Sequence, residues 1–80
     1  MDVNMKMPDL ATNEGALLLV TRWLVNTGQS VKRGQTLLEV ETDKALQEVE
    51  CIANGTLKNI HVEAGQKVSV GTIIATIKVA

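Results

Sequence analysis

The segment VNTGQSVKRGQTLLEV, residues 25–40, is echoed by VEAGQKVSVGTIIATI, residues 62–77, and this pair decides the fold. The two segments agree at one fixed offset of 37 residues, with Val25, Gly28, Gln29, Val31, Gly34, Leu37 and Val40 matching Val62, Gly65, Gln66, Val68, Gly71, Ile74 and Ile77. The shared pattern is an apolar residue, a glycine turn with positive φ, one buried valine, a second glycine turn and the next strand. Two such units predict two similar half-sheets related by a pseudo-twofold axis, each closing edges that the other leaves open.

Short apolar or alternating runs, separated by frequent turn pairs, extend this interpretation to the rest of the chain. Turn pairs such as Asn54-Gly55 and Ala64-Gly65 bound the runs, and no glycine-free window carries the apolar stripe of a helix. We therefore predict an all-β fold, a flattened β-barrel or sandwich of two quasi-symmetric half-sheets. The expected strands are Val3–Met7, Leu17–Val25, Thr36–Glu41, Ala45–Glu50, Thr56–His61 and Thr72–Val79.

Length and composition restrict the class of protein. Eighty residues suffice for one small domain, expected over residues 1–80 with a core over about 3–79. A net charge of −1 argues against a nucleic-acid partner, which would require a basic face. The longest apolar run, Ala16–Val20, is far shorter than a membrane span, and the single cysteine, Cys51, fits a reducing compartment. The expectation is an intracellular protein with no membrane or nucleic-acid partner.

Residues that could support independent catalysis or metal binding are few. His61 follows an alternating strand, which favours a structural or solvated histidine, and Cys51 is expected to be a small, semi-buried apolar residue. Glu39, Glu41 and Asp43 alternate along one strand, but they lack a further oxygen ligand and are interpreted as a solvated face rather than a metal site. No catalytic residue and no metal site are predicted.

One turn has no counterpart in the repeat. The first unit continues from Val40 into VETDKALQEV, residues 40–49, whereas the second continues from Ile77 only to Ala80, so Lys44 has no equivalent. A tight hairpin turn directs a side chain outward, and the four methylenes of lysine lengthen that projection. Lys44 is thus either an ordinary solvated lysine or an attachment point for another group.

The five residues ETDKA, 41–45, resemble the lipoyl-attachment motif of the lipoyl (biotinyl-lipoyl) domains found in acyltransferase components of 2-oxo acid dehydrogenase complexes. The resemblance covers nearly the whole chain, from about Val3 to Ile77. The supporting residues are Met7-Pro8-Asp9-Leu10, Trp23-Leu24-Val25, Gly28, Val31, Gly34, Leu37-Leu38-Glu39-Val40, Gly55, Ile60, Val62, Gly65, Val68 and Gly71.

This resemblance implies a covalent lipoyl group on Lys44. It also implies that Asp43 and Ala45 frame the turn and contribute to recognition by the decarboxylase, and that Glu41 helps the lipoate-attaching enzyme choose its substrate. The loop after the first strand would be a surface for partner recognition, formed by Ala11, Thr12, Asn13, Glu14 and Gly15.

The implied function is that of a swinging-arm carrier, not of an enzyme, although the parent protein could be a dihydrolipoamide acyltransferase. Its partners would be a lipoate-attaching enzyme, a thiamine-diphosphate-dependent decarboxylase, an acyltransferase core and a dihydrolipoyl dehydrogenase. The complex would act on a 2-oxo acid or on acetoin, in the bacterial cytoplasm or the mitochondrial matrix.

Two alternatives stay open at this point: a biotin carrier domain, or an unmodified interaction domain of the same fold. Met5-Lys6-Met7 resembles the biotin-attachment tripeptide, but it lies in the expected first strand instead of the central turn. The sequence also departs from the lipoyl pattern before Gly55, where the family often has two prolines and this chain has ECIAN, residues 50–54. Neither departure touches the turn at Lys44.

Overall fold

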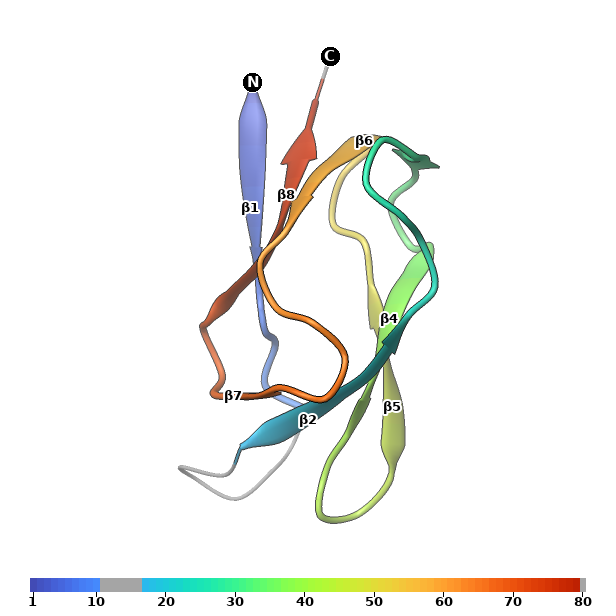
Figure 1. The fold of residues 1–80 in the computed structure, drawn as a ribbon. Coiled ribbons are helices and arrows are strands. Elements are labelled where there is room, and N and C mark those ends of the chain that lie inside the picture. The colour runs from blue at the N-terminus through green and yellow to red at the C-terminus, as the bar shows by residue number, and fades with distance from the viewer. Residues whose placement is uncertain (11–16, 80) are drawn as a thin grey trace.

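Two antiparallel sheets of four strands each enclose the core in a computed structural model, which describes residues 1–10 and 17–79. The strand order is β1-β8-β6-β3 in one sheet and β5-β4-β2-β7 in the other (Figure 1). The strands are β1 (Asp2–Lys6), β2 (Leu18–Trp23), β3 (Ser30–Val31), β4 (Thr36–Glu41), β5 (Leu46–Glu50), β6 (Gly55–Ile60), β7 (Lys67–Val68) and β8 (Ile73–Lys78). No helix long and apolar enough to cross a membrane occurs in these residues. The predicted all-β class is confirmed.

The internal repeat of the sequence is a repeat of structure. Strands β2, β3 and β4 reappear 37 residues later as β6, β7 and β8, with the same lengths. The two sheet orders also correspond strand for strand, since β1, β8, β6 and β3 take the places of β5, β4, β2 and β7. The predicted pair of half-sheets about a pseudo-twofold axis is therefore present.

The six predicted strands all form, with ends shifted by no more than two residues. The prediction missed β3 and β7, which have only two residues each and so carry no alternation for a pattern to detect. Each contains one of the repeated valines, Val31 or Val68, and both valines are buried as expected. Each of the two short strands forms one edge of its sheet.

The core is aliphatic, and the apolar positions of the repeat lie within it. Leu37, Val40, Ile74 and Ile77 are fully buried between the sheets. Trp23 is only partly buried, and its indole Nε1 donates a hydrogen bond to the carbonyl of Val62 at 2.8 Å. Burial of these side chains supplies the main driving force for folding, because it removes the aliphatic surface of both inner faces from contact with water.

The repeated Gly-Gln pair builds the same turn twice. Gly28 and Gly65 adopt positive φ angles of 87° and 95°, a conformation that disfavours a side chain with a Cβ atom. The following glutamines then fold back, so that Oε1 of Gln29 accepts from the Asn26 amide and Oε1 of Gln66 from the Glu63 amide. The glutamine matches thus have a structural cause that the sequence pattern did not identify.

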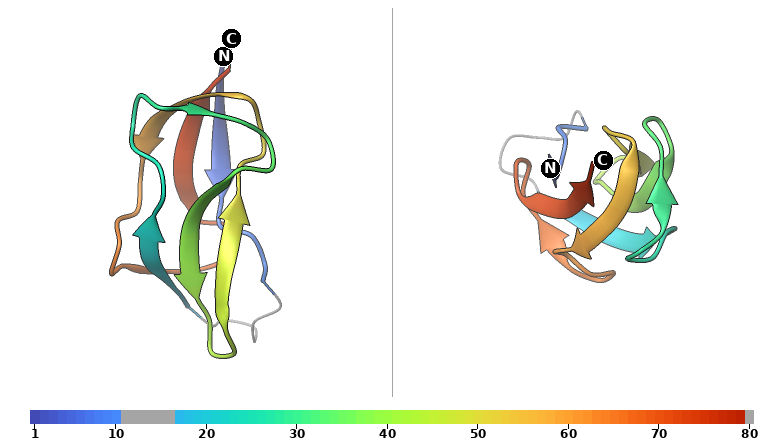
Figure 2. Two further views of the ribbon diagram at one scale, coloured as in Figure 1. Left: turned by 90° about the vertical axis from the view of Figure 1, so that its right-hand side faces the viewer. Right: turned by 90° about the horizontal axis from the view of Figure 1, so that it is seen from above.

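The two chain ends lie side by side at one end of the molecule. The amide of Val79 donates to the carbonyl of Met1 at 2.7 Å, which continues the pairing of β1 with β8. In the other sheet, the equivalent strands β5 and β4 are joined by the Lys44 turn. Figures 1 and 2 show this turn at the end of the molecule opposite the termini. The described residues extend over 36 × 19 × 19 Å, so the two ends are well separated.

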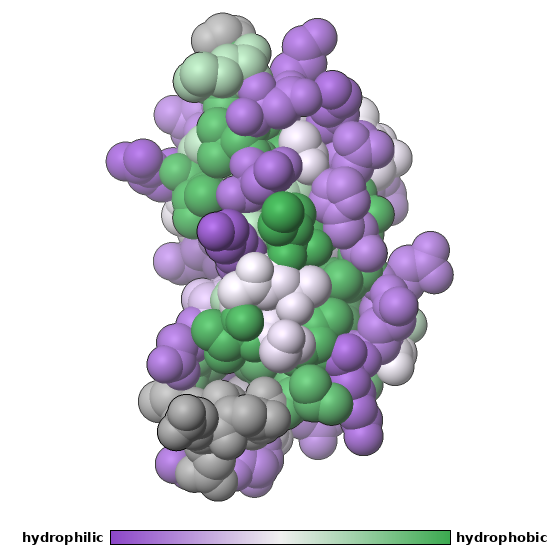
Figure 3. All heavy atoms as spheres, turned by 90° about the vertical axis from the view of Figure 1, so that its left-hand side faces the viewer, coloured by the Kyte–Doolittle hydropathy of each residue, from purple (hydrophilic) through white to green (hydrophobic). Residues whose placement is uncertain are grey.

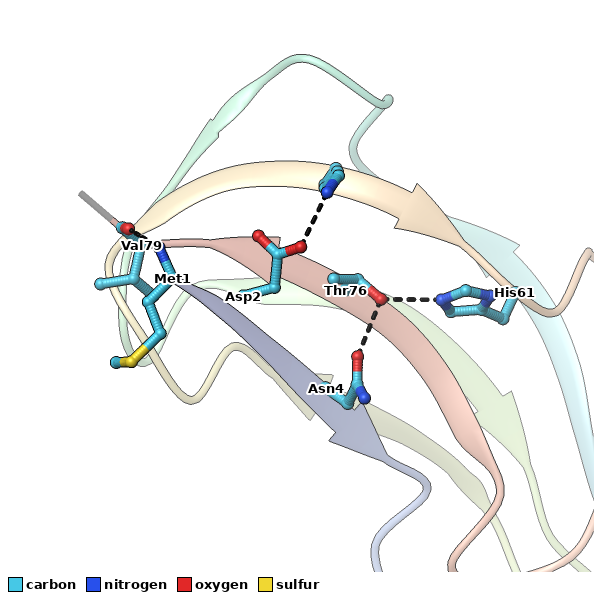
Figure 4. Close-up of polar contacts among 7 residues, drawn as sticks. Met1, Asp2, Asn4, His61, Thr76 and Val79 are labelled. Atoms are coloured by element: carbon cyan, nitrogen blue, oxygen red, sulfur yellow. Dashed lines mark hydrogen bonds and ion pairs between the residues drawn. The ribbon is translucent and has the colours of Figure 1, made fainter.

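A polar network covers the outer face of the β1-β8-β6 sheet (Figure 4). Thr76 donates through Oγ1 to Oδ1 of Asn4 at 3.0 Å, so the His61 nitrogen Nε2, 2.8 Å from the same oxygen, is the donor to it. His61 thus takes part in a hydrogen-bond network on the surface of the sheet. Nearby, Lys58 Nζ lies 2.7 Å from Asp2 Oδ2, and this ion pair lowers the pKa of the Asp2 carboxyl.

Cys51 is more deeply buried than the semi-buried position that we predicted. Its side chain is 2% exposed, and Sγ lies 3.0 Å from the Ala53 carbonyl. The backbone explains this position, because the Cys51 amide donates to Gln35 and the Cys51 carbonyl accepts from Gly34. Those two bonds hold the end of β5 against the start of β4 and turn the thiol inward.

Candidate functional site

The hairpin formed by β4 and β5 presents the candidate site at its tip. The strands pair in register up to Glu41 and Leu46, and the amide of Thr42 then donates to the carbonyl of Ala45 at 2.9 Å. Only Asp43 and Lys44 lie between those two residues, so the turn has two central positions. The predicted tight, exposed hairpin turn is confirmed.

The Thr42 hydroxyl organises this turn. Oγ1 accepts hydrogen bonds from the amides of Lys44 at 3.2 Å and Ala45 at 3.1 Å, and it donates to the carbonyl of Ala45 at 3.0 Å. Sequence reasoning assigned Thr42 no role. The signal was available, because a hydroxyl residue at the first position of a turn commonly binds the amides two and three residues later.

Lys44 and its immediate neighbours Glu41, Asp43 and Ala45 are all exposed, whereas Thr42 is half-buried. The fold therefore fixes the backbone of the turn through Thr42 and leaves the side chain of Lys44 directed into solvent. An exposed primary amine on a hydrogen-bonded turn can be acylated by an enzyme without displacement of core residues. The geometry fits an attachment point for a carboxylic acid cofactor.

The surface next to Lys44 is shallowly concave. Seven residues line this concavity: Thr21, Glu41, Thr42, Asp43, Lys44, Ala45 and Leu46. Leu46 is the large apolar member, with 55% of its surface exposed although it begins strand β5. The site thus combines a cationic attachment point, two carboxylates and one exposed leucine.

The three alternating acidic residues do not converge. Glu39 pairs with Arg22 across the sheet, which ties it to strand β2. Glu41 and Asp43 lie farther along, at the tip and within the turn. Within residues 1–10 and 17–79, no group of three His, Cys, Asp or Glu side chains could hold a metal ion. The carboxylates near the tip accordingly form part of the exposed surface beside Lys44.

Two other features were predicted from the sequence. Lys6 is exposed at the end of edge strand β1, at a bulge opposite Ile73, so the Met-Lys-Met sequence occupies a strand and not a turn. The predicted recognition loop, Ala11, Thr12, Asn13, Glu14 and Gly15, lies outside the described residues.

Comparison with known proteins agrees with this geometry. The Biotin_lipoyl family model, described as "Biotin-requiring enzyme", matches residues 3–77. The dihydrolipoyllysine-residue acetyltransferase component of the pyruvate dehydrogenase complex from Rhizobium meliloti is 42% identical over 80 residues, covering 96% of this chain and 17% of that protein. The pyruvate dehydrogenase E1 component subunit beta of the same organism is 40% identical, with the same coverage of both chains.

A solved structure has the same fold. The lipoyl domain of the 2-oxoglutarate dehydrogenase complex from Azotobacter vinelandii superposes with a TM-score of 0.77 at 28% identity, covering 95% of each chain. In contrast, the chain spans about a sixth of the length of the two Rhizobium relatives. The chain therefore belongs to the biotin/lipoyl attachment family, and within it to the lipoyl carrier domains of 2-oxo acid dehydrogenase acyltransferase components.

Proposed function

We propose that Lys44 carries a lipoyl group in amide linkage and that residues 1–80 act as one swinging-arm carrier domain. The observation that carries this proposal is the position of Lys44, exposed at the tip of a hydrogen-bonded hairpin at the far end from the chain termini. A carrier must present its cofactor to several active sites in turn. A rigid body that presents the attachment point at the end opposite its chain termini meets that requirement.

The residues around Lys44 fit a lipoyl group. Amide formation removes the ammonium charge, and the exposed turn accommodates the added chain without a change in the core. When bound, the dithiolane supplies a reversible carrier for acyl groups and for reducing equivalents. The protein itself supplies position: Thr42 holds the turn, and the paired strands β4 and β5 hold Thr42.

We assign three neighbouring residues to recognition. Asp43 and Ala45 flank the lysine, so a decarboxylase that receives the arm meets both before it meets the body of the domain. Glu41 is the exposed last residue of β4, directly before the turn, where a lipoate-attaching enzyme can contact it while it acylates Lys44. The loop Ala11, Thr12, Asn13, Glu14 and Gly15 is assigned to partner recognition from the resemblance alone.

The proposed partners follow from the complexes in which similar domains occur. They are a thiamine-diphosphate-dependent decarboxylase, an acyltransferase core and a dihydrolipoyl dehydrogenase, together with the enzyme that attaches lipoate. We propose that the parent protein is a dihydrolipoamide acyltransferase and that it acts in the bacterial cytoplasm or the mitochondrial matrix. These proposals extend beyond the part of the relatives that the chain matches.

A reductive acylation assay tests this function. The lipoylated domain is offered to a panel of thiamine-diphosphate-dependent decarboxylases, each with its own 2-oxo acid or with acetoin, and acylation is followed by intact mass. We expect rapid acylation by one member of the panel and slow or no acylation by the others. A lipoylated, folded domain that no member acylates would contradict the carrier role.

A further inference from the structure

The exposed leucine beside the attachment point suggests a second role for the concave surface. Leu46 is 55% exposed on a strand whose inward residue, Val49, is 3% exposed. It pairs with Glu41 across the ladder, and both line the concavity that also contains Lys44. Figure 3 shows a different face of the molecule, on the left-hand side of Figure 1, where hydrophobic and hydrophilic residues are interspersed. An apolar side chain within two residues of a cofactor anchor is thus a feature to be explained.

We propose that Leu46 is a resting site for the lipoyl group attached to Lys44, so that the dithiolane ring alternates between this leucine and solvent. The inference rests on the proposed function, since it requires a lipoyl group on Lys44. Leu46 is a positioning residue in this account, because it contacts the carrier group without taking part in acyl transfer. Its position on β5 directs the resting arm to one face of the hairpin.

The tether makes such a weak contact effective. Leu46 follows Lys44 by two residues, which span at most about 7 Å of extended chain, so the lysine and lipoyl chains easily reach it. A ligand held by a short flexible linker has an effective concentration in the millimolar range. Burial of apolar ring and leucine surface favours the contact, whereas ordering of the flexible arm opposes it. We take these two effects as balanced, which gives an occupancy of about one half.

Leu46 is the large apolar contact beside the attachment point, although its cross-strand partner Glu41 lies on the same face of the sheet. After acylation of Lys44, Glu41 and Asp43 remain as charged groups at the tip, and a neutral dithiolane gains nothing from either carboxylate. Ala45 and Leu46 are the apolar residues among those that line the concavity. A half-occupied site would also leave the arm extended often enough that delivery to a partner slows by no more than about twofold.

The first test is a nuclear Overhauser measurement on the fully lipoylated domain, with the extent and position of modification established by intact mass and peptide mapping. We expect contacts between the dithiolane ring protons and the Leu46 methyl groups, and none to Leu24. Leu24 is a matched control because it is 40% exposed, yet its amide bonds to Leu37, at the end of β4 remote from the turn. A Lys44-acetylated domain shows which shift changes arise only from loss of the charge.

The second test is the rate at which a water-soluble phosphine reduces the lipoyl disulfide to the dithiol, with water oxygen passing to the phosphine oxide. Leu46→Thr keeps a strand-forming residue and removes the resting contact, so we expect reduction about twofold faster than in the wild type. Leu24→Thr should leave the rate unchanged. Absence of the Leu46 contacts, or an unchanged rate in Leu46→Thr, would overturn the inference while the carrier role stands. A folded domain that cannot be lipoylated on Lys44 would overturn both.

Discussion

Replacement of Thr42 by valine tests whether the hydroxyl organises the turn that presents Lys44. Valine has the same shape and removes all three hydrogen bonds of Oγ1, two accepted from amides at 3.2 and 3.1 Å and one donated to a carbonyl at 3.0 Å. The turn is exposed, so water can form hydrogen bonds with the freed backbone groups and offset part of the lost stabilisation. We therefore expect a net loss of about 1 kcal/mol, similar to the loss of a hydroxyl cap at a helix N-terminus.

In a domain of this size, a loss of about 1 kcal/mol lowers the melting temperature by roughly 4–8 °C. If the same free energy opens the turn locally, the population of the ordered turn falls by up to about fivefold, and the initial rate of lipoate attachment falls with it. Thermal unfolding followed by circular dichroism and a time course of intact mass measure the two effects. Both measurements are made on the same protein preparation.

Two controls make this experiment decisive. Thr42→Ser keeps Oγ1 and should remain within about 0.5 kcal/mol of the wild type. Thr56→Val makes the same chemical change at an exposed position of β6, far from the turn in the other sheet, and should leave attachment unaffected. If Thr42→Val matches Thr42→Ser in both melting temperature and attachment rate, the hydroxyl does not hold the turn.

Three further predictions concern Gly55, Asp2 and Asp43. Gly55→Ala places a Cβ atom 2.1 Å from a backbone carbonyl oxygen of β8 and should cost about 3 kcal/mol by thermal unfolding. Gly28→Ala, which meets no atom within 4 Å but has a φ of 87°, should cost only about 1 kcal/mol; equal losses would exclude the steric account. Because Lys58 lowers the folded-state pKa of Asp2 below 3.8, the ion pair stabilises the fold above that pH and is lost as the pH falls through the lowered value. Asp2→Asn should therefore reduce the difference in melting temperature between pH 6 and pH 2.5, and an unchanged difference would contradict this role. Asp43→Ala should slow reductive acylation by the decarboxylase more than lipoate attachment, whereas equal slowing of both would show that Asp43 only shapes the turn.

Much of the fold could be predicted because the same sequence pattern occurs twice, once for each half-sheet. A valine or leucine at a fixed distance from two glycines identifies a buried position, and Val25, Val31, Val62 and Val68 are all buried. The exposed turn followed from the break in that repeat at Lys44. These features depend on local spacing, which a single sequence displays directly.

Other features depend on contacts between distant segments, which local spacing does not encode. Gly55 was expected as part of a turn, but the structure also places it against the backbone of β8, where a side chain would collide. Its equivalent in the first unit is the buried Leu18, so the symmetry fails at this pair. Likewise, the inward position of Cys51 depends on its backbone bonds to Gly34 and Gln35 across the hairpin.

The candidate site was predicted only in part for the same reason. Lys44 and its neighbours follow from the motif, whereas the hydrogen bonds of Thr42 require the closed geometry of the turn. The exposure of Leu46 was also not predictable, because alternation along Ala45–Glu50 does not state which face lies inward until β4 is paired beside it. Thr21 lines the same concavity as the turn residues because it lies on β2, the strand that pairs with β4.

The central claim is that Lys44 is the lipoylated residue, and mapping of the attachment site tests it most directly. The folded domain is incubated with a lipoate-attaching enzyme, and the product is analysed by intact mass and peptide mapping, with Lys44→Arg and Lys6→Arg as paired variants. We predict one lipoyl group per chain, on Lys44, in the wild type and in Lys6→Arg, and none in Lys44→Arg. A folded wild-type domain that stays unmodified, or one that carries its group on Lys6, would contradict the account.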